Sequence, residues 1–139
     1  MPQGPPPSTE TGYIRDILRQ LRQLRQSILG LLIERVNTVT ASGSAQTLPD
    51  SNRATMHHIT LTANCALTFP TPLAGKSFTL KLIQDGTGSR AVTWPTSVCR
   101  FDSGTAPTLS TAAGSIDTFS CVCDDGTKFD VYFAGKGMA

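Results

Sequence analysis

The sequence has little charge, few aromatic residues and no long apolar run. Charged residues make up 16% and aromatic residues 6% of its 139 residues, whereas charged residues make up about a quarter of a typical soluble domain. The longest apolar stretch, Ile28 to Ile33, is interrupted by Gly30 and is too short to cross a bilayer. Met1 is followed by Pro-Gln-Gly-Pro-Pro-Pro and not by the features of a secretory signal. We therefore expect no membrane insertion, and synthesis and assembly in a cytoplasm.

Motifs of enzyme chemistry are also missing. The sequence contains no Gly-x-Ser-x-Gly, no Walker loop and no His-Glu-x-x-His, which are the usual signatures of a nucleophile, a phosphate loop and a catalytic zinc site. Asp124-Asp125 precedes a glycine in a predicted turn, where Asp is favoured for backbone reasons. Trp94 and Tyr132 could form a sugar-stacking surface, but a Trp before a proline at a strand end is more often a core or interface residue. We predict no enzymatic activity and no cofactor.

Histidine is scarce, and the two histidines are adjacent. His57 and His58 would point to opposite faces of a strand, so they cannot easily bind one metal ion together. One of them could meet its own copies at a threefold axis and form a metal site from three chains. Ordinary interfacial histidines are the commoner outcome of such an arrangement, so we predict no metal site.

The four cysteines, Cys65, Cys99, Cys121 and Cys123, are better explained as small apolar core residues than as ligands. Cys121 and Cys123 alternate with Ser120 and Val122 in a strand-like run. The sequence has no second pair of cysteines or histidines at the spacing of a zinc site. Synthesis in a cytoplasm favours free thiols. A disulfide that forms late, after cell lysis, remains an alternative for Cys65 or Cys99.

Charge is distributed unevenly but weakly. Residues 1–45 carry five Arg and three acidic residues, and residues 46–139 carry seven basic and seven acidic residues. A nucleic-acid-binding protein usually presents a concentrated basic face, so nucleic acid is not an expected partner.

A heptad pattern is the strongest periodic signal. Its apolar positions follow each other at spacings of 3, 4, 3, 4 and 3, and they are Ile14, Ile17, Leu21, Leu24, Ile28 and Leu31. Thr11 is a plausible N-cap, and the pattern predicts a coiled-coil helix over residues 11–36. Because Ile occurs at both core positions, the pattern favours three strands or more over two. We predict a parallel homotrimer.

Two alternatives to the coiled coil remain open. An amphipathic helix could pack on its own domain, although this apolar stripe is narrow and regular, and short helices are unstable without a partner. A basic helix lying on a membrane surface is a weaker alternative, because the segment lacks Trp and Lys.

The residues around the helix are interpreted as an arm, a linker and a β domain. Residues 1–10 are rich in Pro and Gly, so we expect an extended arm that becomes ordered on a partner. Residues 37–53 contain Thr, Ser, Gly and a Pro49 turn, and are expected to be a linker. Residues 54–139 show alternating apolar and polar residues in four runs, near residues 59–63, 78–82, 119–123 and 129–133. With turn signals at Asp85-Gly86 and Asp125-Gly126, these runs predict a small antiparallel β-sandwich of six to eight strands without an internal repeat.

Two longer stretches carry a family resemblance. They are Leu67 to Pro95, LTFPTPLAGKSFTLKLIQDGTGSRAVTWP, and Gly104 to Phe119, GTAPTLSTAAGSIDTF, followed by DGTKFDVYFAGKG from Asp125. They resemble a small β domain of bacteriophage tail-fibre-type virion proteins, often found at the C-terminal end. The resemblance covers about two-thirds of the chain and implies a virion location and a trimer. It supplies no receptor-binding or catalytic residue.

The resemblance and the residue patterns together predict a bacteriophage virion structural protein. We favour a short trimeric tail fibre, attached to the baseplate through its N-terminus and presenting the β domain for host adsorption. The alternative is a trimeric capsid decoration, or cement, protein that stabilises the head. A fragment of an enzyme that cleaves host polysaccharide is the rival class. Expected partners are the chain itself, other virion proteins and a host surface receptor.

Overall fold

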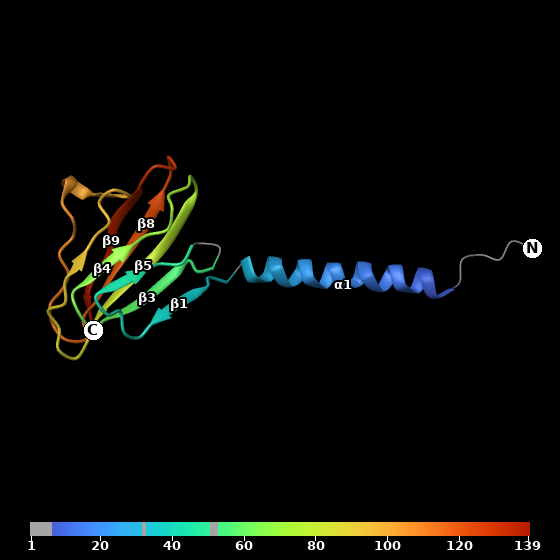
Figure 1. The fold of residues 1–139 in the computed structure, drawn as a ribbon, viewed down its shortest axis with the longest axis horizontal. Coiled ribbons are helices and arrows are strands. Elements are labelled where there is room, and N and C mark those ends of the chain that lie inside the picture. The colour runs from blue at the N-terminus through green and yellow to red at the C-terminus, as the bar shows by residue number, and fades with distance from the viewer. Residues whose placement is uncertain (1–6, 32, 51–52) are drawn as a thin grey trace, which may run out of the picture. The chain divides into compact units, whose positions relative to one another are not determined.

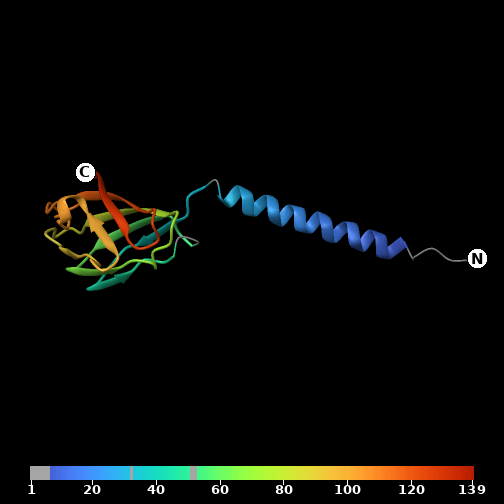
Figure 2. The same cartoon turned by 90° about the horizontal axis from the view of Figure 1, so that it is seen from above.

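The computed structural model describes residues 7–31, 33–50 and 53–139, which form one helix, nine strands and a short 3-10 helix. The chain divides into two compact units, residues 1–34 and 35–139. The helix is α1 (Pro7–Leu31), unbroken in Figure 1 and Figure 2. The strands are β1 (Val36–Val39), β2 (Ala45–Thr47), β3 (Met56–Leu61), β4 (Cys65–Thr68), β5 (Lys76–Gln84), β6 (Val92–Thr93), β7 (Cys99–Phe101), β8 (Ile116–Cys123) and β9 (Phe129–Met138), with the 3-10 helix η1 (Asp102–Gly104) after β7.

The helix begins and ends earlier than its predicted range of 11–36. Its first residue is Pro7, so Thr11 lies inside the helix and the expected arm loses residues 7–10; residues 1–6 lie outside the described part. Proline suits a first turn because its φ is already helical and its missing N–H is not needed there. At the other end Val36 belongs to β1, where it pairs with Met56. Cross-strand pairing of a β-branched residue therefore overrides the apolar stripe that suggested continuation.

The β unit contains a parallel coil that the expected antiparallel sandwich did not include. Strands β1, β3 and β5 pair in parallel in one sheet, and β2, β4 and β6 pair in parallel in the other. The chain therefore alternates between two sheets, as in a short solenoid. The antiparallel pairs are β5 with β8 and β8 with β9, and β7 pairs with β9 in parallel. The larger sheet has the order β1-β3-β5-β8-β9-β7, and its labelled strands lie side by side in Figure 1.

The predicted linker over 37–53 is part of this coil. It contains most of β1 and all of β2, and Leu48 after β2 is fully buried in the core. In sequence these short, polar strands resemble a linker. They are ordered by pairing with strands about twenty residues further on, which the local sequence does not show. The β unit consequently starts near Arg35 and not at residue 54.

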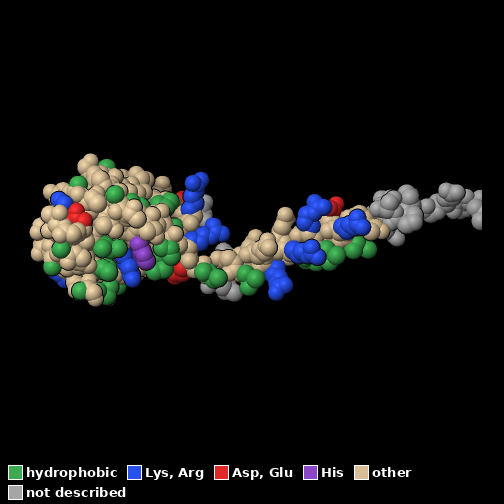
Figure 3. Space-filling model, turned by 90° about the horizontal axis from the view of Figure 1, so that it is seen from below, with side chains coloured by type: hydrophobic (Ala, Val, Ile, Leu, Met, Phe, Trp, Pro, Cys, Tyr) green, Lys and Arg blue, Asp and Glu red, His purple; other side chains and the backbone are tan. Residues whose placement is uncertain are grey.

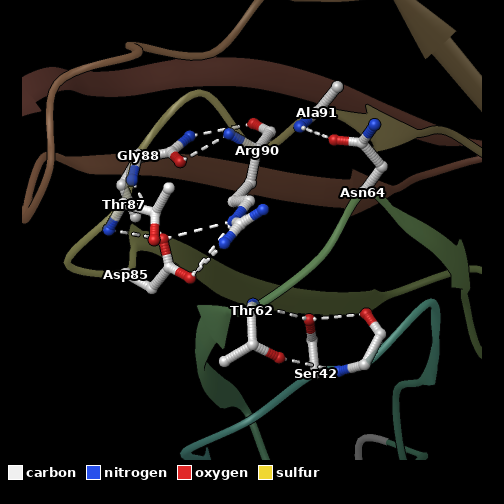
Figure 4. A network of polar contacts seen from close by, with 10 residues as sticks. Ser42, Thr62, Asn64, Asp85, Thr87, Gly88, Arg90 and Ala91 are labelled. Atoms are coloured by element: carbon white, nitrogen blue, oxygen red, sulfur yellow. Dashed lines mark hydrogen bonds and ion pairs between the residues drawn. The ribbon is translucent and has the colours of Figure 1, made fainter.

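The turns that connect the two sheets are joined to each other by polar contacts, as Figure 4 shows. The Thr62 N–H donates to the Ser42 Oγ at 3.3 Å, which links the β1–β2 turn to the β3–β4 turn. The Ala91 N–H donates to the Asn64 Oδ1 at 2.9 Å, which links the β3–β4 turn to the β5–β6 turn. Successive turns of the coil are therefore held in register at their ends as well as along their strands.

The β5–β6 turn is fixed by a carboxylate and a glycine. The Asp85 carboxylate accepts the Gly88 N–H at 2.9 Å and forms an ion pair with Arg90 at 2.8 Å (Figure 4). The Arg90 guanidinium, followed by the backbone donors, lowers the pKa of Asp85. Gly88 has φ +73, and a Cβ there would lie 2.5 Å from the Thr111 carbonyl oxygen. Only glycine allows this turn to approach the 111–113 backbone so closely.

One hydrophobic core receives side chains from both sheets. The alternation predicted for β3, β5, β8 and the start of β9 is confirmed, since their inward positions are buried. Edge-to-face aromatic contacts connect the core, for example Phe119 with Trp94 at 5.0 Å and Phe69 with Phe78 at 5.2 Å between ring centroids. Trp94 is buried, as expected of a core residue.

A buried carboxylate joins β8, β9 and the loop between β7 and β8. Asp117 is fully buried and accepts three hydrogen bonds, from the Ser110 N–H at 2.6 Å, the Ser110 Oγ at 2.9 Å and the Gly137 N–H at 2.8 Å. A buried carboxylate stabilises the fold only while all of its hydrogen bonds are made, because losing one leaves a buried polar group without a partner.

Replacing Asp117 with Asn is expected to lower the free energy of unfolding by about 2 kcal/mol. The amide group would turn a donor toward one of the N–H or O–H donors that the carboxylate now satisfies. Urea unfolding at fixed protein concentration, followed by the fluorescence of Trp94, measures the change. Asp102→Asn alters an exposed carboxylate and should change stability by less than about 0.5 kcal/mol. Equal stability of the two variants would contradict a structural role for Asp117.

Candidate oligomerisation interface

The predicted heptad positions form an apolar stripe on α1. Ile14, Ile17, Leu21, Leu24 and Ile28 are between 38% and 57% exposed, and every residue from Thr11 to Leu29 is exposed. Leu31, the sixth position, ends the helix, and its side chain lies outside the described part. In Figure 3 apolar side chains gather along one edge of α1, while most of its Arg side chains project elsewhere. Among the described residues of the helical unit, none covers this stripe.

A helix of this composition depends on a partner. Most helical stability in proteins comes from packing of an apolar face, and the 25 residues of α1 expose theirs. A contiguous exposed stripe is also unusual on a monomer. Association of copies through the stripe would satisfy both requirements.

The positions beside the stripe are mostly uncharged. Tyr13 and Leu18 flank the first heptad and are 70% and 47% exposed, so they widen the apolar surface. In the following heptads the flanking positions are occupied by Gln20, Arg25 and Ser27. Of the flanking residues between Thr11 and Leu29, Arg25 alone is charged. Arg19 pairs with Asp16 at 2.9 Å on the outer side of its own helix. Apolar packing, and not salt bridges between helices, would therefore hold the copies together.

The cysteines lie in the core and not at a surface. All four are free and buried, which confirms their interpretation as core residues. Burial raises the pKa of the Cys99 thiol to about 12, and burial also raises the pKa of Cys65. A neutral buried thiol is a poor nucleophile. A disulfide from Cys65 or Cys99 stays a prediction, and it would require local opening of the β unit.

The two histidines lie on opposite faces of β3, as predicted. His57 is completely buried, with its ring edge against Phe78 at 5.3 Å between centroids. His58 is partly exposed on the other face. His57 is therefore a core residue and not an interfacial one. Among the described residues, no group of three or more His, Cys, Asp or Glu side chains is arranged to hold a metal ion.

The Asp124-Asp125 pair belongs to the turn between β8 and β9. Asp125 accepts the Thr127 N–H at 2.8 Å and the Thr127 Oγ1 at 2.7 Å. These bonds, the backbone one first, lower the pKa of Asp125 well below its usual range. Asp125 thus has the backbone role that the turn signal predicted, whereas Asp124 contacts Arg100 at 3.4 Å. In the part of the chain that is described, no helix has both the length and the hydrophobicity to cross a membrane.

Comparison with protein families matches residues 39–127 to the family described as "Putative phage tail fibre C-terminal domain". The match covers well over half of the chain. The chain belongs to this family. The resemblance seen in the sequence is thereby confirmed, and the tail fibre domain includes most of the parallel coil, β7 and β8. No curated protein and no solved structure matches the chain.

Membership of the tail fibre family places the chain among structural components of the phage virion, specifically of the tail. The alternative of a capsid decoration protein finds no support in the comparisons. Helix α1 and strand β9 lie outside the matched residues. The apolar stripe is therefore a property of this chain that the family match does not explain.

Sequence reasoning missed one group of side chains. Arg100 on β7 and Asp130 on β9 form an ion pair at 2.6 Å, next to the exposed Tyr132. Trp94 is buried, so it does not form the suggested sugar-stacking surface with Tyr132. The alternation along β9 indicates that Tyr132 points outward. The sequence does not indicate that Arg100 lies beside it.

Proposed function

We propose that the chain forms a short homotrimeric tail fibre. In this proposal three α1 helices associate in parallel through the apolar stripe, the N-terminal residues attach the trimer to the baseplate, and the β units act in host adsorption. The observation that carries it is an uncovered heptad stripe on a member of a tail fibre family. The trimer, in preference to a dimer, is supported by Ile at both kinds of core position.

The order of the two units supports this division of labour. A coiled coil holds three chains in one register and gives three copies of each end. Three weak contacts made together bind far more tightly than one, provided that all three can engage at once. A β unit with a single modest binding surface would then be sufficient for adsorption. The helix would have no enzymatic role, and the absence of activity stays a prediction.

Deletion of residues 1–6 is expected to separate attachment from adsorption. The deletion spares α1, which begins at Pro7, so the product should remain a trimer. It should no longer join the virion when it is supplied during assembly, yet the purified truncated trimer should compete with intact phage for host cells as well as the full-length trimer does. Quantitative mass spectrometry of purified particles and an adsorption assay give the two measurements.

Normal incorporation of the truncated protein would show that attachment lies elsewhere in the chain. Failure of the full-length trimer to slow adsorption, even at saturating concentration, would remove the adsorption role. Copy number adds a control on location, since a fibre should be present in far fewer copies than the major capsid protein.

A further inference from the structure

Two adjoining hollows run along strand β9. They share the lining residues Phe101, Asp102, Val131 and Tyr132, and they have volumes of about 470 Å³ and 520 Å³. Arg100 and Asp130 complete the first hollow, and Phe133 and Lys136 line the second. The two hollows adjoin at these shared residues and are together called the Tyr132 groove here. Its size is that of small-molecule sites in proteins.

The groove exists because β7 ends early. β7 pairs with β9 only as far as Phe101 opposite Val131, and η1 then leads the chain away from the sheet. Ser103 in η1 has φ 54, an uncommon backbone conformation for a residue other than glycine. From Tyr132 onward the edge of β9 therefore faces the segment after β7 across an open space.

Aromatic rings form the apolar part of the groove. Tyr132 is 53% exposed although it lies within a strand. Phe101 is held from behind by Trp94, at 5.7 Å between ring centroids, and Phe133 stacks at a tilt on Phe119 at 4.5 Å. Rigid, supported rings offer flat apolar surfaces at little entropic cost to the protein. Such surfaces suit the flat C–H faces of sugar rings.

The polar part of the groove is held by an ion-pair network, and its lining carries no net charge. Arg100 donates to Asp130 at 2.6 Å and to Asp125 at 2.9 Å, with Asp124 at 3.4 Å. One guanidinium thus faces three carboxylates, and Asp102 adds a fourth on the groove lining. Carboxylates have acceptor positions left over for hydroxyl groups. Across the lining, Arg100 and Lys136 balance Asp102 and Asp130, so the groove has no net charge with which to attract a phosphorylated or carboxylated ligand.

We propose that the Tyr132 groove binds an uncharged saccharide, with a sugar ring on Tyr132 and its hydroxyl groups on the Asp130 and Asp102 carboxylates. This inference rests on the proposed role in adsorption and names the ligand class for it. The pairing of exposed aromatic rings with oriented acceptors distinguishes the groove from the other exposed apolar side chains of the β unit, such as Leu73.

The test uses the full-length trimer on an array of neutral and acidic bacterial oligosaccharides. Binding should be confined to uncharged chains. Tyr132→Ala should weaken the strongest binding by about tenfold or more, because it removes the stacking surface, whereas Tyr132→Phe should stay within about threefold of the wild type. Leu73→Ala, which truncates an exposed apolar residue outside the groove, should bind like the wild type. Thermal unfolding and light scattering check that each variant keeps its fold and mass.

Three results would overturn the groove assignment. They are no binding on the array, preference for acidic chains, and binding that is indifferent to Tyr132→Ala. A lower oligomeric mass of Tyr132→Ala would also overturn it, because the ring would then belong to a contact between subunits. If the groove fails but the trimer still blocks adsorption, the proposed function stands with another surface. If sugar binding is found but adsorption is not blocked, the groove stands and the adsorption role falls.

Discussion

If α1 trimerises as proposed, Leu24→Asp is expected to give monomers with an unfolded helix at micromolar concentration. The substitution would place three carboxylates together at the axis of the coiled coil, where each is removed from water and none has a partner. An unpaired buried charge costs several kcal/mol, which is a large part of the association energy of so short a coil. Once separated, α1 has no apolar contacts to stabilise it.

Light scattering gives the mass, and circular dichroism gives the helical content. The β unit should remain folded, since no described side chain of α1 belongs to its core, and the fluorescence of Trp94 reports on it. Gln23→Asp is the matched control, because it introduces the same carboxylate one residue away, outside the heptad stripe; it should remain trimeric. A monomeric wild-type protein, or a trimeric Leu24→Asp variant, would refute the coiled coil.

Acidification is expected to destabilise the β unit already at pH values above those at which carboxylates become protonated. His57 is fully buried, and its Nε2 atom has no hydrogen-bond partner among the described residues. The Asn37 amide makes a long contact of 3.4 Å to its Nδ1. Burial, and to a lesser degree the neighbouring His58, lowers the pKa of His57 from 6.5 to about 4. The folded protein therefore holds a neutral imidazole at a pH where the unfolded chain is protonated.

The direction of the effect follows from the proton count. Above pH 6.5 both states are neutral at His57, and stability is complete. Between pH 6.5 and pH 4 the unfolded chain binds the additional proton, so acidification favours unfolding, and below about pH 4 the loss levels off. The lowered pKa corresponds to about 3 kcal/mol lost across this window.

Urea unfolding followed by Trp94 fluorescence at several pH values between 7 and 4 measures this loss. His57→Leu should remove most of the pH dependence in the window, although it also changes the overall stability. His58→Gln, on the outer face of the same strand, should keep it. Identical pH profiles for His57→Leu and the wild type would show that another group titrates.

Periodic local signals explain which parts of the fold could be predicted. The heptad spacing located α1 because its residues from Ile14 to Leu31 repeat without interruption. Alternation located β3, β5, β8 and β9 because each has one buried face. The strands β1, β2, β4, β6 and β7 are four residues long or shorter, too short to show a period, and they exist through pairing with distant segments.

Topology failed for a related reason. Asp125-Gly126 does join an antiparallel pair, β8 and β9, but Asp85-Gly86 connects β5 to β6, which lie in different sheets. A turn signal indicates a change of direction and does not identify the strand that the chain will meet. The Tyr132 groove could not be predicted from the sequence for the same reason, since Arg100 and Tyr132 are brought together by the pairing of β7 with β9.

The parallel coil also sets the order in which the molecule folds. Each of its ladders joins segments that are at least twenty residues apart, as with Val36 and Met56, so a loop must close before any contact forms. Chains dominated by such distant contacts fold in milliseconds to seconds, whereas helices form in about a microsecond. If three α1 segments associate as proposed, they can do so while their β units are still unfolded. The unfinished sheets of the three copies would then be held near one another during a period when their edges are open to mispairing.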